Sequence, residues 1–235
     1  MKRLLLALGV SAAMAAPAQA ENTPVVVELF TSQGCSSCPP ADEMMKTLVA
    51  RDDVIALSLH VDYWDYIGWK DEFADPGHAK RQRSYAAVAG RRSVYTPEMI
   101  VNGTTDIVGA KPMDLAMAIE EHKEAPKAVS VELSPSQNDR VLIEAQAMVD
   151  GLGPMDVVML RYQPARVARI TRGENAGRTI EYVNVAESWQ LVSTWNGEGP
   201  LSIETAVPGD HPVVVLIQAQ NHGPIKGAAR LVVAD

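Results

Sequence analysis

The sequence predicts an α/β domain followed by an all-β domain built as an antiparallel sandwich. Three observations predict this order. Apolar β-branched runs alternate with helical periodicity up to about residue 124, short strands separated by turn residues fill the chain from about residue 127, and Ala125-Pro126 stands between the two regimes. Because proline ends a preceding helix, we place the boundary there, with one domain over residues 21–125 and the other over residues 126–235.

The first twenty residues are typical of a secretory signal peptide. Lys2 and Arg3 are positive, residues 4–16 are apolar and rich in alanine, and Ala18-Gln19-Ala20 offers small residues for cleavage. The apolar run is too short to span a bilayer, which favours a cleaved signal over residues 1–20 rather than an anchor. We therefore expect a periplasmic or secreted protein with no membrane insertion after cleavage.

The charge of the chain argues against anionic partners. The formal net charge is −8, and loss of Lys2 and Arg3 with the signal would bring it to about −10. A chain of this charge repels phosphate backbones and anionic lipid, so we expect no nucleic-acid partner. The oligomeric state stays open.

The α/β domain is expected to begin with a strand, a helix and a second strand. Residues 25–30 and 54–61 are apolar runs of the kind buried on both faces of a sheet. Between them, apolar residues recur at helical spacing from Cys38 to Val49. This order predicts a parallel strand pair with a right-handed crossover.

The rest of this domain continues with an aromatic segment, a polar helix, a hairpin and a closing helix. The polar helix covers roughly residues 76–91 and the closing helix residues 112–122. Asn102-Gly103 is the strongest two-residue hairpin signal, and it joins expected strands at 99–101 and 105–108.

The second domain is expected to consist of short strands separated by turns. Such a series at short spacing indicates an antiparallel sandwich. The expected strands cover residues 129–133, 141–149, 157–162, 166–170, 179–185, 188–195, 201–205, 213–219 and 228–233.

The two cysteines, Cys35 and Cys38, carry the functional argument. In an exported protein a disulfide persists, but a loop this short removes little chain entropy, so a purely structural bond is a weak explanation. Cys35 lies at the predicted strand-to-helix turn, where unpaired N–H groups and the helix dipole stabilise a thiolate. We predict that Cys35 is the nucleophile, that Cys38 is the more buried resolving thiol, and that the chain is a thiol–disulfide oxidoreductase.

Several segments resemble the thioredoxin superfamily. Cys35-Ser36-Ser37-Cys38-Pro39 follows a buried strand, and Thr96-Pro97 precedes another strand and resembles the cis-proline of thioredoxins. The resemblance implies a thioredoxin-like fold for the first domain, with Pro97 positioning the partner chain and Thr96 contacting it. It departs from ordinary thioredoxins in the Ser-Ser dipeptide, in Gly34 before Cys35 where thioredoxins have tryptophan, and in a long insertion before Pro97.

A narrower resemblance is to an uncharacterised family of secreted bacterial thioredoxin-like proteins, a domain-of-unknown-function family. The segments Glu28–Cys35, His60–Asp65 and Tyr95–Pro97 carry it. This family supplies a fold but no established substrate.

Glu28 is a carboxylate inside the first expected strand, seven residues before Cys35. Thioredoxins have a buried aspartate near this position that moves protons for the second cysteine. We therefore expect Glu28 to be the proton acceptor for Cys38. The alternative is a solvated carboxylate at a strand end.

Other residues have a functional and a structural interpretation. Trp64 and its aromatic neighbours are a candidate substrate surface beside the cysteines, or they pack the insertion onto the sheet. His60 is a candidate copper ligand with the two thiolates, or a hydrogen-bonded residue at a strand end. The basic residues of the polar helix, Arg81 among them, are most simply a solvated face. Residues 172–178 are expected to be a plain hairpin loop.

The leading function is therefore an exported oxidoreductase that acts on protein thiols or disulfides, or on a redox partner protein. We expect no cofactor and no resident metal. Two alternatives stay open: a non-enzymatic binding protein with a redox-switch cysteine pair, and copper delivery by the two thiolates.

Overall fold

The computed structural model describes residues 23–232, so the predicted signal peptide at residues 1–20 lies outside the described part of the chain. The elements in chain order are β1 (Val25–Thr31), α1 (Pro39–Leu48), β2 (Val54–His60), the short 3₁₀ helix η1 (Asp65–Ile67), α2 (Pro76–Val88), β3 (Glu98–Val101), β4 (Thr105–Val108), α3 (Pro112–Glu124), β5 (Val129–Ser136), β6 (Arg140–Ala147), β7 (Met155–Arg169), β8 (Thr179–Trp195), β9 (Leu201–Ala206), β10 (Val213–Ala219) and β11 (Ile225–Leu231).

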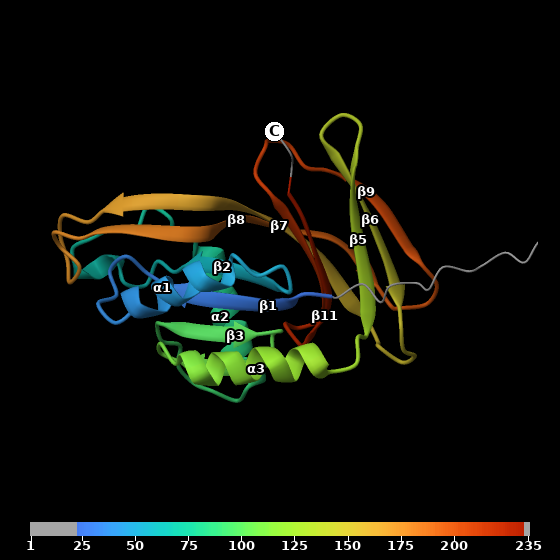
Figure 1. Cartoon of the computed structure of the whole chain (residues 1–235), viewed down its shortest axis with the longest axis horizontal. Coiled ribbons are helices and arrows are strands. Elements are labelled where there is room, and N and C mark those ends of the chain that lie inside the picture. The colour runs from blue at the N-terminus through green and yellow to red at the C-terminus, as the bar shows by residue number, and fades with distance from the viewer. Residues whose placement is uncertain (1–22, 233–235) are drawn as a thin grey trace, which may run out of the picture.

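The strands form one large mixed sheet and one small sheet (Figure 1). The large sheet has eight strands in the order β11-β10-β7-β8-β2-β1-β3-β4, and the small sheet has three in the order β5-β6-β9. In Figure 1 the small sheet stands upright at the right, across one end of the large sheet. The long hairpin of β7 and β8 runs to the opposite end, where β1 ends and α1 begins.

The predicted architecture, an α/β thioredoxin-like domain followed by an all-β antiparallel sandwich, is wrong. Strands β7, β8, β10 and β11 come from the second half of the chain, yet they extend the same sheet as β1 to β4. β8 pairs in parallel with β2 at Ser58 and Val185, which joins the two halves. The residues of a strand show that it is buried but not which strand lies beside it, so local patterns do not predict a shared sheet.

The strand boundaries of the second half change for the same reason. Four expected strands merge into two long ones, β7 with 15 residues and β8 with 17, which pair antiparallel along their length. The boundary at residues 125 and 126 stays a prediction: α3 ends beside it at Glu124, while strands from both sides share the large sheet.

Local expectations in the first half are confirmed. β1 and β2 pair in parallel, with Val25 beside Val54 and Thr31 beside His60. β3 and β4 form the expected hairpin, in which Asn102 and Gly103 have φ values of 45° and 72°. Both residues adopt the positive φ that this tight turn requires.

Strand β1 is buried on both faces, and its side chains alternate between the two faces of the sheet. Val25, Val27 and Leu29 belong to the core cluster that contains residues of α1 and α3. Val26 and Phe30 belong to the cluster on the other face, which contains residues of α2. Because successive side chains of a strand point to opposite faces, Glu28 shares the α2 face and Thr31 shares the α1 face.

A third core cluster packs the small sheet against the large one. It joins residues of β5 and β6, such as Val129 and Ile143, with residues of β7 and β10, such as Val157 and Val215. At Gly227 of β11 a Cβ atom would lie 2.7 Å from the carbonyl oxygen of Val129, so only glycine permits this approach of the two sheets. No helix within residues 23–232 has the length and apolar composition needed to cross a membrane.

Candidate functional site

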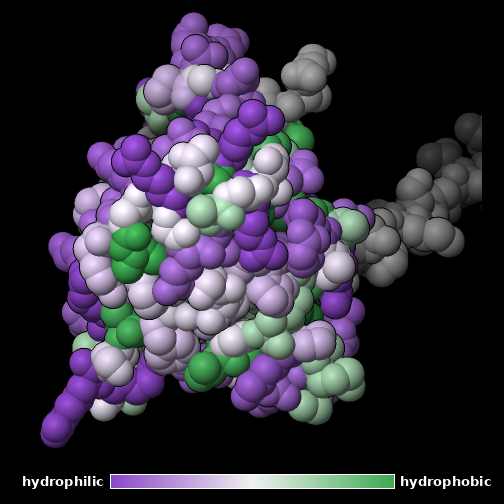
Figure 2. Space-filling view, turned by 90° about the vertical axis from the view of Figure 1, so that its left-hand side faces the viewer, coloured by the Kyte–Doolittle hydropathy of each residue, from purple (hydrophilic) through white to green (hydrophobic). Residues whose placement is uncertain are grey.

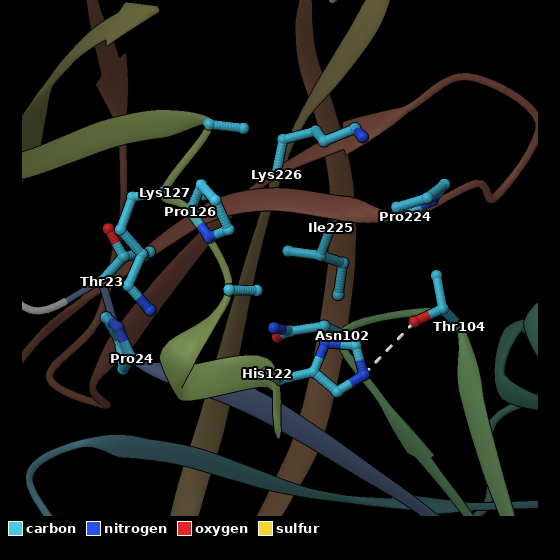
Figure 3. A pocket seen from close by; sticks show the side chains of 13 residues that line it. Thr23, Pro24, Asn102, Thr104, His122, Pro126, Lys127, Pro224, Ile225 and Lys226 are labelled. Atoms are coloured by element: carbon cyan, nitrogen blue, oxygen red, sulfur yellow. Dashed lines mark hydrogen bonds between the residues drawn. The ribbon is translucent and has the colours of Figure 1, made fainter. Parts of the chain in front are cut away.

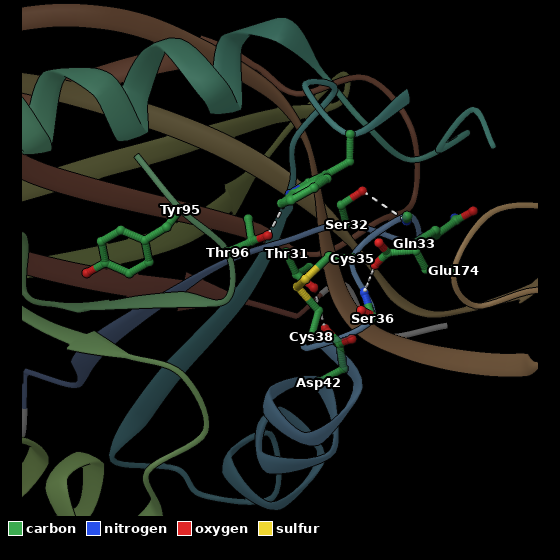
Figure 4. Close-up of a disulfide and its surroundings, with 12 residues drawn as sticks. Thr31, Ser32, Gln33, Cys35, Ser36, Cys38, Asp42, Tyr95, Thr96 and Glu174 are labelled. Atoms are coloured by element: carbon green, nitrogen blue, oxygen red, sulfur yellow. Dashed lines mark hydrogen bonds between the residues drawn. A yellow bond between two sulfur atoms is a disulfide. The ribbon is translucent and has the colours of Figure 1, made fainter. Parts of the chain in front are cut away.

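The two cysteines lie in the loop between the end of β1 and the start of α1, and they form a disulfide with a Cα–Cα distance of 5.4 Å (Figure 4). Cys38 is the N-cap of α1, and the amide of Cys38 donates to the carbonyl of Cys35 at 3.2 Å. The helix begins with Pro39 and Pro40, which lack amide N–H groups and hold φ near helical values. Ser36 and Ser37 face solvent, whereas Cys35 is 3% and Cys38 0% exposed.

Asp42 is a buried carboxyl one helical turn after Cys38. Its Oδ1 accepts a hydrogen bond from the Thr31 hydroxyl at 2.8 Å, while its buried Oδ2 has no partner among the described residues. Burial raises the pKa of Asp42 to about 7, against the lowering effect of His60 and of the Thr31 hydroxyl. Asp42 can therefore release or take up a proton near neutral pH. Figure 4 shows it below the disulfide, on the same helix end as Cys38.

His60 and Asp71 form a second buried pair on this side of the sheet. His60 ends β2 in register with Thr31, so both side chains point to the α1 face. Its Nδ1 lies 2.7 Å from Oδ2 of Asp71, and its Nε2 has no hydrogen-bond partner among the described residues. Burial alone would raise the pKa of Asp71, but His60 and two backbone amides outweigh it and lower that pKa. Tyr182 of β8 packs edge-on against the His60 ring, 4.6 Å between centroids.

Gln33 links the disulfide loop to this pair. Its amide donates to Asp71 Oδ2 at 2.8 Å, and its side-chain Oε1 accepts from the Trp69 indole at 2.7 Å. Its side chain is fully buried. Sequence reasoning did not single out Gln33, because a polar residue in a loop carries no local sign of burial.

The structure brings Trp64 and Thr96 together. The Trp64 indole donates to the Thr96 hydroxyl at 2.7 Å, and the Thr96-Pro97 bond is cis. Trp64 also stacks on Tyr66, which is 79% exposed, with 6.3 Å between the ring centroids. A Cβ atom at Gly34 would lie 3.2 Å from Cβ of Trp64, so residue 64 packs tightly beside the disulfide loop. Figure 4 shows Thr96 facing the disulfide.

Glu28 does not lie beside the cysteines, and its expected role as proton acceptor for Cys38 needs correction. Because it points to the α2 face, it meets Arg81 at 2.6 Å and the Tyr85 hydroxyl at 2.6 Å. Arg81 is only 6% exposed, so the expected solvated helix face is also wrong at this residue. Arg81 further donates to Gln218 of β10 at 3.0 Å, which ties α2 to a strand of the second half.

The loop between β7 and β8 is more than a plain hairpin connection. Asn175 in this loop donates to the carbonyls of Gln33 and Cys35, both at 2.9 Å. Its side chain is buried, with 2% exposed. Nothing in the local sequence predicts this contact, since 140 positions separate Asn175 from Cys35.

The site does not gather metal ligands. Within residues 23–232 no group of three His, Cys, Asp or Glu side chains is placed to hold a metal ion. His60, the candidate copper ligand, is engaged with Asp71, and both cysteines are bonded to each other.

A separate cavity of about 190 Å³ lies at the other end of β3, where α3 and β11 meet (Figure 3). Two of its polar side chains are engaged in holding the fold: Asn102 accepts from the amide of Val26 at 2.8 Å, and His122 bonds the Thr105 hydroxyl at 2.8 Å. The disulfide network therefore remains the candidate site.

Comparisons with known proteins give a family and a similar solved structure, and neither names an activity. A family model described as a protein of unknown function, DUF1223, matches residues 26–218. The chain is similar to an Agrobacterium tumefaciens protein whose X-ray structure comes from a structural genomics consortium, with 31% identity and a TM-score of 0.77. That alignment covers 90% of this chain and 95% of the other. A search of the curated proteins finds no match.

Proposed function

We propose that this chain, which belongs to the DUF1223 family of proteins of unknown function, is a thiol–disulfide oxidoreductase that acts through Cys35 and Cys38. One observation carries the proposal: a disulfide at a helix start has a buried carboxyl, Asp42, one turn behind it with a pKa near neutral. A structural disulfide of this short span contributes little stability and has no use for such a group. A dithiol that exchanges protons and electrons uses one directly.

The exchange can be written from the oxidised form. A thiolate of a partner protein attacks Sγ of Cys35, the Cys35–Cys38 bond breaks, and its electron pair stays on Sγ of Cys38. Cys38 takes the proton of Asp42, which later regains one from solvent. A second partner thiolate attacks the partner's sulfur in the mixed disulfide and releases the Cys35 thiolate. Overall the partner dithiol loses two electrons and two protons. The cysteine pair gains both electrons and, at Cys38, one proton, and the other proton goes to solvent. The reverse sequence reduces a partner disulfide.

Asp42 takes the role first given to Glu28. Its position four residues after Cys38 places both on one face of α1, whereas Glu28 points to the other side of the sheet. With a pKa of about 7, Asp42 can serve as acid when the disulfide opens and as base when Cys38 attacks the mixed disulfide. Thr31 holds Oδ1 and leaves Oδ2 free for this exchange.

Three further statements belong to the proposal. Export to the periplasm or beyond rests on the signal-like residues 1–20. Kinship with thioredoxins rests on the Cys35 to Cys38 motif and the cis Thr96-Pro97 bond, which are local features. Contact of the partner polypeptide with Thr96 and Trp64 rests on the place of Thr96 in Figure 4, on its bond to the Trp64 indole, and on the packing of Trp64 against Gly34. Protein thiols and disulfides are the partner class, and an acidic chain disfavours nucleic acid.

The deciding experiment measures turnover and potential together. The mature protein is assayed for insulin reduction and for refolding of a reduced substrate. Its reduction potential is measured by equilibrating the cysteine pair with glutathione. We expect turnover and a potential clearly above about −300 mV, the upper edge of the structural range. Cys38→Ala should trap a mixed disulfide with its partner, whereas Cys35→Ala should trap none.

Absence of turnover together with a potential below about −300 mV would overturn the proposal and favour the binding-protein alternative. Stoichiometric uptake of Cu(I) by the reduced protein, without turnover, would favour metal delivery instead.

A further inference from the structure

We propose that residues 172–178, the loop between β7 and β8, form a latch over the dithiol, with Asn175 as the positioning residue that closes it. The biological meaning of the latch rests on the proposed redox function. Its effect on the disulfide can be measured without a protein substrate. Figure 1 shows the long hairpin reaching the end of the molecule where β1 ends and α1 begins.

The side chain of Asn175 has a complete set of partners. Its Nδ2 donates to the carbonyls of Gln33 and Cys35, both at 2.9 Å, and its Oδ1 accepts from the Arg178 guanidinium at 3.1 Å. Both carbonyls belong to the loop that carries the disulfide. The amide therefore holds the backbone on either side of Gly34 in one position.

The two residues before Asn175 add contacts. Glu174 accepts from the amide of Ser36 at 3.3 Å, a pair drawn in Figure 4. A Cβ atom at Gly173 would lie 3.2 Å from Cβ of Trp69, so the latch backbone packs closely against residue 69. Trp69 in turn bonds Gln33. Three consecutive latch residues thus touch the disulfide loop or its immediate support.

The latch accounts for an apparent conflict in the site. Cys35 is the sulfur that a partner must attack, yet it is only 3% exposed. Thiol–disulfide exchange depends on access to the attacked sulfur along the line of the breaking bond. With the latch closed, access is restricted; when the Asn175 bonds break, the loop at residues 33–35 is free to move. The reaction rate of a thiol too bulky to pass the closed latch then follows the fraction of molecules with an open latch.

A closed latch should make the site discriminate between thiols by their size. Figure 2 views the disulfide end of the molecule, where hydrophobic residues are scattered among hydrophilic ones. The ionisable groups around the cysteines include Glu174 and Arg178 on the latch, Asp42 on α1, and the Asp71–His60 pair beneath. A small thiol enters past a closed latch more readily than a bulky one, so restricted access discriminates between thiols by size.

The test compares how fast two thiols of different size open the disulfide of the full mature chain. We measure second-order rate constants for 2-mercaptoethanol and for glutathione, each in excess, by quenching with an alkylating reagent. Asn175→Ala should raise the glutathione rate constant about tenfold, the change expected when one or two net hydrogen bonds are lost. The 2-mercaptoethanol rate should rise less, so the ratio of the two rates changes.

Two further variants make the test decisive. Glu174→Ala alters an exposed residue, so it leaves folding intact, and it should shift the same ratio in the same direction by a smaller factor. Asn196→Ala is the matched control: this asparagine also sits in a hairpin turn, where it accepts from the amide of Glu198, but it lies at the far end of β8. It should leave both rates unchanged.

Unchanged rates in folded Asn175→Ala and Glu174→Ala would overturn the latch. If Asn175→Ala does not fold, Glu174→Ala decides alone, and a wild-type ratio in that variant rejects the proposal. The two proposals fail separately. If the protein reduces insulin but the variants show no latch effect, only the latch proposal is refuted. If the ratio of the two thiol rates changes but the protein shows no turnover, only the oxidoreductase proposal is refuted.

Discussion

Replacing Asp42 by asparagine should change how the stability of the oxidised protein depends on pH. The asparagine keeps the shape of the side chain and the acceptor for the Thr31 hydroxyl, but it cannot ionise. In the folded protein the pKa of Asp42 is raised from 3.8 to about 7. The folded state therefore holds this proton more tightly than the unfolded state does, and the cost of ionisation is present only in the wild type.

The sign and size of the effect follow from linkage. Well below the unfolded-state pKa of 3.8 the carboxyl is protonated in both states and contributes no penalty. As pH rises through about 7 the folded protein must ionise a buried group, so stability is lost between these limits. The raised pKa corresponds to a loss of about 4 kcal/mol by pH 8. The free energy of unfolding of Asp42→Asn relative to wild type should rise by about this amount between pH 4 and pH 8.

Urea denaturation of the oxidised proteins at several pH values measures this difference, since other titrating groups contribute equally to both. Asp52→Asn, in the exposed turn after α1, is the matched control and should show no such trend. A difference between Asp42→Asn and wild type that stays constant from pH 4 to pH 8 would refute the reasoning. The same variant should slow disulfide exchange at neutral pH about a hundredfold if Asp42 moves the proton of Cys38.

Two other substitutions separate the parts of the site. Glu28→Gln should destabilise the protein by about 3–5 kcal/mol in urea denaturation, because it breaks a buried ion pair with Arg81. The same variant should leave the pH profile of disulfide exchange as in wild type, and a shifted profile would mean that Glu28 does take part in proton transfer. Trp64→Phe removes the bond to the Thr96 hydroxyl and should raise KM for insulin about fivefold. The rate with 2-mercaptoethanol should not change in Trp64→Phe, and an equal loss with insulin and with 2-mercaptoethanol would point to a general defect.

Local patterns predicted the parts of the site that depend on neighbours in sequence. The strand before Cys35, the helix after Cys38 and the parallel partner strand all follow from short-range periodicity and are confirmed. The burial order of the two cysteines follows from their place at the helix start. The hairpin at Asn102-Gly103 follows from the φ values that this dipeptide favours.

Local sequence patterns did not predict which carboxyl group lies on the same side of the sheet as Cys38. Glu28 and Asp42 are both acidic residues close in sequence to the cysteines, and neither has a local sign of its environment. Strand alternation turns Glu28 to one face of the sheet and Thr31 to the other, and α1 lies on the Thr31 face. The spacing of Asp42 four residues after Cys38 was a usable signal, because it places both side chains on one helix face.

The sequence by itself determined the local setting of the two cysteines: a pair at the start of a helix, next to a strand buried on both faces. These features are local, and a few residues of β-branched, apolar, cysteine and proline type suffice to specify them. Only the tertiary structure decided that one sheet joins both halves of the chain, that Asp42 is buried beside Thr31, and that Asn175 donates to the carbonyl of Cys35. Strand pairing and hydrogen bonds across 140 positions depend on how separate elements pack, which no local pattern records.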